Sequence, residues 1–197
     1  MGLFQKKNTD GAPVSERQLL QSKYAGARSN LILVILFTLI NVVLLVTNSN
    51  SYFLFSAAIP YAFAMIGMDA CGKFPAEYYD PTYEYEFLPD SFFVFMLVLA
   101  AAVLLLYLVS WIFSKKEKYG WLVAALVLFI IDTVGMFLVF EITSDIVIDV
   151  VFHAWVIYSL ASGINAALKL KKLPEEELPV AEEIPVAEEE TPAESEE

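Results

Sequence analysis

The chain contains 197 residues, of which 58% are hydrophobic, and its mean hydropathy is +0.60. A water-soluble domain of this length is nearer half apolar, so the composition excludes an ordinary soluble domain and indicates an integral membrane protein. The net charge of -12 does not imply a basic partner, because eleven of the 24 acids lie from Glu175 onward and the rest of the chain is nearly neutral.

The first 30 residues are polar, and their basic residues are Lys6, Lys7, Arg17, Lys23 and Arg28. No apolar stretch of the signal-peptide type precedes the first long apolar run. We therefore expect residues 1–30 to form a cytoplasmic segment, and we expect the first apolar run to act as its own insertion signal.

Five apolar runs follow, and a helix that spans a membrane needs about 20 mostly apolar residues. The runs at 31–47, 91–113, 121–140 and 146–168 reach or approach that length. The remaining run, from Ser51 to Met68, contains several polar residues and is interrupted by Pro60. Because proline removes a hydrogen bond from the interior of a helix, this run is the weakest candidate for a span.

The positions of the basic residues decide whether the run from Ser51 to Met68 crosses, because Lys and Arg near spanning helices stay on the cytoplasmic side. With four spans, the N-terminal segment, the linker "SKKEK" and the final "KLKK" all lie inside, and only Lys73 lies outside. With five spans, the last two basic groups would lie outside. The sequence therefore predicts an all-α bundle of four transmembrane helices plus an interfacial or re-entrant helical segment, with five transmembrane helices as the alternative.

This topology divides the chain into a cytoplasmic segment at 1–30, a membrane domain at 31–168 and a tail at 169–197. The membrane domain includes an external region at 48–90. We expect the protein to lie in the cell membrane with both termini in the cytoplasm. The tail is rich in acids and proline and cannot bury enough apolar area to offset its ordering entropy, so we expect it to be disordered.

Ionisable residues lie within the last two predicted spans. Asp132 lies about 13 Å from the external end of its helix and His153 about 12 Å from the external end of the next one, at 1.5 Å per residue. The connection between these helices is short, so they are expected to be antiparallel neighbours with Asp132 and His153 at nearly the same depth. Asn41 lies in the same half of the first span, and Asp149 shares a helix face with His153.

A carboxyl group at this depth costs several kcal/mol unless it is paired or protonated. Asp132 can be stabilised by a hydrogen bond from His153, by one from Asn41 or Thr133, or by protonation. Two interpretations remain open at this point. In one, Asp132, His153 and Asp149 form a proton relay or cation site; in the other, these polar groups fix the register between helices.

Small residues line the last predicted span, where Gly163 and Ala167 have the spacing that lets two helices approach closely. They predict a helix-packing face. Packing within the chain is the first interpretation, and a homodimer face is the alternative.

The sequence contains no motif of a hydrolase, a nucleotide-binding loop or a kinase, and with one histidine and no HExxH motif it lacks the usual ligand set of a zinc site. We expect no cofactor, no metal and no catalytic residue. The basic residues are few and are needed for topology, so nucleic acid is not an expected partner. The expected partners are the lipid bilayer and either another membrane protein or further copies of the chain.

In its overall layout the chain resembles the small uncharacterised multi-pass membrane proteins of Gram-positive bacteria. The resemblance rests on layout and not on a motif, so it implies no activity and no site residues. The functional expectation is a non-enzymatic accessory or scaffold subunit. A small proton- or cation-linked transporter or channel that uses Asp132 and His153 is the alternative, and an intramembrane enzyme comes third.

Overall fold

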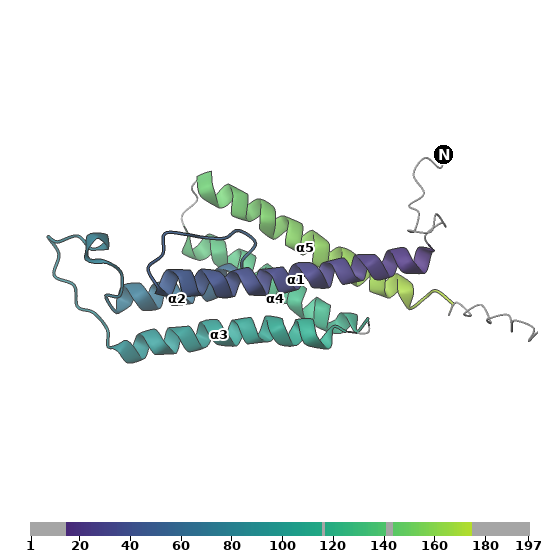
Figure 1. Cartoon of the computed structure of the whole chain (residues 1–197), viewed down its shortest axis with the longest axis horizontal. Coiled ribbons are helices and arrows are strands. Elements are labelled where there is room, and N and C mark those ends of the chain that lie inside the picture. Colours follow the sequence, from purple (N-terminus) through teal and green to yellow (C-terminus); the bar gives the residue numbers. More distant parts are fainter. Residues whose placement is uncertain (1–14, 116, 141–143, 175–197) are drawn as a thin grey trace, which may run out of the picture.

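The computed structural model describes residues 15–115, 117–140 and 144–174, and in these ranges it is helical without any strand (Figure 1). Four helices in the described ranges are long and apolar enough to cross a membrane. They are α1 (Glu16–Val46), α3 (Asp90–Phe113), α4 (Tyr119–Val139) and α5 (Ser144–Leu170, apolar from Val147). The predicted fold class, an all-α membrane bundle with four transmembrane helices, is therefore confirmed.

The apolar run from Ser51 to Met68, which Pro60 interrupts, forms a re-entrant segment. Residues 47–57 are not helical, and helix α2 (Ala58–Ala70) has 13 residues, a length of about 20 Å that is too short for a hydrocarbon core of about 30 Å. In Figure 1 the loop after α1 doubles back before α2 begins. The chain then returns through the short helix η1 (Ala76–Tyr78) to α3, so the segment enters and leaves at one end of the bundle.

Helix α1 begins far earlier than the apolar run at 31–47 that was predicted as the first span. The hydroxyl of Ser15 accepts a hydrogen bond from the backbone N–H of Gln18 at 3.2 Å, and the Gln18 side chain accepts from the backbone N–H of Ser15 at 3.3 Å. This capping box supplies partners for exposed donors at the helix start. The polar residues that follow are therefore a continuous extension of the spanning helix.

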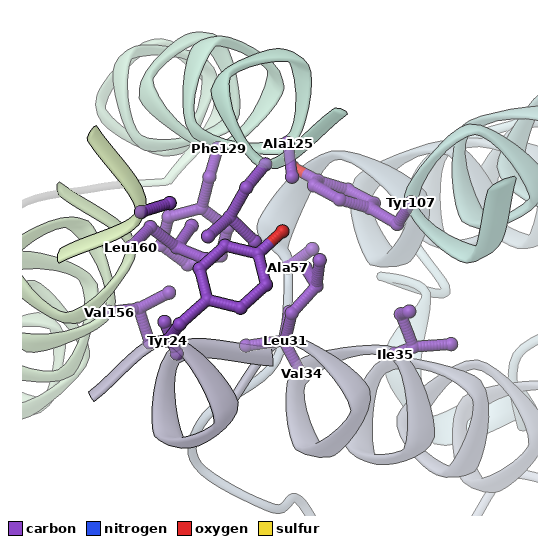
Figure 2. Packing of buried hydrophobic residues seen from close by; sticks show 13 residues of the cluster. Tyr24, Leu31, Val34, Ile35, Ala57, Tyr107, Ala125, Phe129, Val156 and Leu160 are labelled. Atoms are coloured by element: carbon purple, nitrogen blue, oxygen red, sulfur yellow. The ribbon is translucent and has the colours of Figure 1, made fainter. Parts of the chain in front are cut away.

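Helix α1 packs along α5, and α2 lies against α1, α3 and α4. Figure 2 shows the central core, in which side chains from α1, α3, α4 and α5 meet around Ala57 of the re-entrant segment. The most enclosed members include Leu31, Tyr107, Phe129 and Leu160. The outward faces of the same helices expose leucine, isoleucine and phenylalanine, which suits helices surrounded by lipid tails.

One end of the bundle gathers basic residues. Arg28 donates to the Ser114 hydroxyl at 3.0 Å and to the Trp111 carbonyl at 3.2 Å, and Tyr24 donates to the Ser114 carbonyl at 2.6 Å. A cation is favourable at the C-terminal end of α3, where carbonyl groups lack helical partners. The start of α1 and the end of α5 lie at this same end of the bundle (Figure 1).

The small residues of α5 face α1 of the same chain. A Cβ atom on Gly163 would collide with the side chain of Ala27 and would lie 3.2 Å from Leu122. Ala167 is completely buried in the central core. The structure thus places the predicted packing face inside the bundle, where the absence of a side chain at Gly163 allows α1 and α5 to approach closely.

We predict that Gly163→Ala destabilises the protein by about 1–3 kcal/mol, because the added methyl group overpacks the α1–α5 contact. The matched control is Gly26→Ala, since a Cβ atom there meets nothing within 4 Å. That substitution should stabilise the helix by about 0.5–1 kcal/mol. Unfolding titrations in mixed detergent micelles measure both changes; equal effects of the two substitutions would contradict the close contact.

Candidate functional site

Asp132 of α4 lies in the interior of the bundle, where its side chain is 1% exposed. Its two carboxylate oxygens accept hydrogen bonds from two consecutive backbone N–H groups, Oδ2 from Ala58 and Oδ1 from Ile59, each at 2.8 Å. Both donors belong to the first turn of α2. The buried carboxylate thus caps the start of the re-entrant helix from a neighbouring spanning helix.

The first N–H groups of any α-helix have no partner within the helix, and the N-terminus carries partial positive charge. At the start of α2 each of these N–H groups has an acceptor outside the helix, or is absent because the residue is proline. Ala57 donates to the Thr38 hydroxyl at 2.7 Å, Ala58 and Ile59 donate to the carboxylate, and Pro60 has no N–H to satisfy. Pro60, which interrupts the apolar run in the sequence, is therefore compatible with the first turn of a helix.

The imidazole of His153 lies on the other side of the same carboxylate, with Nε2 at 3.3 Å from Oδ2 of Asp132. Its Nδ1 lies 2.8 Å from the backbone carbonyl of Asp149, and its ring stacks on Phe129 with centroids 4.9 Å apart. A carbonyl can only accept, so Nδ1 carries a proton in this contact. The contact at Nε2 is then a hydrogen bond only when the Asp132–His153 pair holds one further proton.

The non-helical part of the re-entrant segment is held by Asn41 of α1. The Asn41 amide donates to the Phe53 carbonyl at 2.7 Å, and its oxygen accepts from the Phe53 N–H at 2.8 Å. The same amide group donates to the Ser56 hydroxyl at 2.9 Å. Lipid offers no hydrogen bonds to irregular backbone, so this side chain replaces the partners that water would give.

Next to this contact, the hydroxyls of Tyr52 and Ser56 are 2.9 Å apart. Desolvation of the hydroxyl is the main cause that raises the pKa of Tyr52 to about 12. The phenol therefore stays protonated at neutral pH and remains able to donate a hydrogen bond to Ser56.

The structure brings Asp132 and His153 together, at the common depth that helix rise predicted. Asp149 takes part through its backbone carbonyl. Asn41 binds the re-entrant segment instead of Asp132, and the Thr133 hydroxyl donates to the Phe129 carbonyl of its own helix at 2.8 Å. Two further acids of the sequence between the last two spans, Glu141 and the side chain of Asp145, lie outside the described residues, as does the acidic tail from residue 175.

Thr38 and Ser56 are site residues that the sequence did not identify. Both are buried, and each binds a group of the re-entrant segment or of α1. A signal existed for Thr38: it precedes Asn41 by three residues, so both polar side chains share one face of an otherwise apolar helix. Across the described residues, no three side chains of His, Cys, Asp or Glu converge as they do in a metal site.

Comparison with known protein families, with curated proteins and with solved structures gives no significant match.

We predict that Asp132→Ala destabilises the protein by about 3–5 kcal/mol, since it leaves two backbone donors and the imidazole without their buried partner. Asp132→Asn keeps one accepting oxygen and should cost about 1–3 kcal/mol. The control is Thr133→Val on the next residue, whose hydroxyl bonds only within its own helix. Unfolding titrations in detergent measure these changes; an Asp132→Ala protein as stable as Thr133→Val would rule out the capping role.

Proposed function

We propose that this chain is a non-enzymatic membrane protein, an accessory or scaffold subunit in which buried polar groups hold a re-entrant segment in a fixed position. The observation that carries the proposal is the double hydrogen bond from the start of α2 to Asp132. An accessory role implies a partner within the bilayer, either another membrane protein or a second copy of the chain.

Both carboxylate oxygens of Asp132 already accept hydrogen bonds within the chain. A catalytic base, a relay group or a cation ligand needs an oxygen lone pair that a substrate or ion can reach. Here each carboxylate oxygen accepts from a backbone N–H that is fixed in a helix, and Oδ2 also faces His153. Opening the site to a substrate would leave these donors unpaired in a medium without water, which costs about 1–3 kcal/mol for each group.

The proposal includes an orientation in the cell membrane with both termini in the cytoplasm. Its support is the position of basic residues at the bundle end formed by the start of α1, the α3–α4 linker and the end of α5. The basic residue at the opposite end, among the described residues, is Lys73.

We expect a membrane-impermeant thiol reagent to label Tyr85→Cys in intact cells and to label Glu117→Cys only after permeabilisation. Both substitutions are made in a Cys71→Ser background, since the natural thiol is the one cysteine of the sequence. Labelling of Glu117→Cys in intact cells would reverse the proposed orientation, and labelling of neither position after permeabilisation would show that the two sites are covered.

A second candidate function is a small proton- or cation-linked transporter. The observation that favours it is the 3.3 Å contact between Nε2 of His153 and Oδ2 of Asp132, which becomes a hydrogen bond when the pair holds a proton between these atoms. Next to this pair, Tyr107 packs against Phe129, and among the described residues its buried hydroxyl has no hydrogen-bond partner. A relay would need such groups to exchange protons with both membrane surfaces.

We expect the purified protein in liposomes to give no proton or cation flux above that of empty liposomes, and we expect His153→Ala to lower stability. The matched control is Asp149→Asn, which preserves the backbone carbonyl bound to His153 and should keep the stability of the parent protein. A pH-dependent flux that disappears in His153→Ala while the protein stays folded would replace the scaffold proposal with transport.

A further inference from the structure

A cavity of about 590 Å³ opens at the end of the bundle where the re-entrant segment enters. It lies outside the Asp132–His153 site, and its walls come from the end of α1, the loop that follows it, Tyr61 of α2 and the loop around η1. The volume lies within the range of pockets that bind small molecules, about 300–1,000 Å³.

The lining of this cavity includes two aromatic pairs. Tyr52 and Tyr61 form one pair, edge to face, with ring centroids 5.3 Å apart. Phe74 and Tyr78 form the other pair, with centroids 4.4 Å apart. Aromatic faces carry negative electrostatic potential and attract ammonium groups, most strongly where water is displaced.

The charged side chain in the lining of the cavity is acidic. Glu77 is the charged residue among those that line it. The nearest lysine in sequence, Lys73, points elsewhere: its ammonium lies 2.8 Å from Asp90 and 5.4 Å from the ring of Phe93 on α3. Acids also follow in the same external loop at Asp80, Glu84 and Glu86. The cavity therefore attracts cations and repels anions.

The loop that forms the outer wall is fastened in place. The Asn48 amide donates to the Lys73 carbonyl at 3.2 Å, which ties the loop to the end of α1. The Tyr79 hydroxyl accepts from the Phe74 N–H at 3.4 Å and donates to the Asp69 carbonyl at 3.3 Å. A wall that is already ordered does not have to be ordered by the ligand, which favours binding.

We propose that this cavity is a binding site for an organic ammonium ion, with the cationic head against the aromatic side chains of the lining and beside Glu77. Alkylated ammonium groups fit this chemistry better than metal ions do, because they combine a positive charge with an apolar surface. Two sources share this chemistry: a small soluble quaternary ammonium ion, and the choline headgroup of a lipid at the membrane surface.

Calorimetric titration of the full-length protein with choline, in nanodiscs of phosphatidylglycerol, tests the site, since this lipid has no ammonium group. We expect saturable binding, and we expect no binding of 3,3-dimethylbutanol, the neutral analogue of the same shape. Repeating the titration in phosphatidylcholine nanodiscs separates the sources: weaker apparent affinity identifies the lipid headgroup as occupant, and unchanged affinity identifies the soluble ion.

Variants locate the binding site. Glu77→Gln should weaken choline binding by about tenfold, or about 1.4 kcal/mol, because it removes the charged side chain from the lining. Tyr78→Leu should weaken it by several-fold. The matched controls, Glu84→Gln and Tyr83→Leu, change the same residue types in the same loop but do not line the cavity, and they should leave the affinity within about twofold.

Three results would overturn the proposal. They are the absence of saturable choline binding in phosphatidylglycerol nanodiscs, equal binding of the neutral analogue, and equal losses in the lining and control variants. None of them bears on the role of Asp132, which lies deeper in the bundle and is tested by stability and flux.

Discussion

The structure depends on the contact between one buried carboxylate and the start of one short helix. A helix that begins inside a membrane exposes N–H groups where lipid supplies no acceptor, and a carboxylate at the same depth lacks a counter-charge. Asp132 and the first turn of α2 resolve both problems together. Each feature would be costly alone, and their pairing makes a re-entrant segment compatible with a four-helix bundle.

Helices α1 and α5 also contribute polar side chains to this site. Thr38 and Asn41 provide hydrogen-bond partners for the backbone that leads into α2, and His153 connects the carboxylate to α5. Polar side chains from three spanning helices therefore converge on one segment that does not span. These polar side chains are buried, and the apolar core around Ala57 (Figure 2) borders them through Phe129, which stacks on His153.

Run lengths and lysine positions were sufficient to predict the four-helix bundle. Helix rise and a short connection likewise predicted the common depth of Asp132 and His153. Helix rotation was not predictable, and it determines that these residues face each other. The spacing of Thr38 and Asn41 places both on one helix face, but it could not identify their partners, because most of these are backbone groups of the re-entrant segment. The early start of α1 was visible in the Ser15 and Gln18 capping box, but the low hydropathy of the residues that follow obscured it.

The N–H groups at the start of α2 are synthesised long before the carboxylate that caps them. Ala58 is made 74 residues before Asp132. While the chain emerges, the non-spanning segment has its α1 contacts available but not its acceptor on α4. It can settle at its final depth only after α4, the third of the four long helices, has entered the bilayer, so a late step of assembly concerns an early part of the polypeptide.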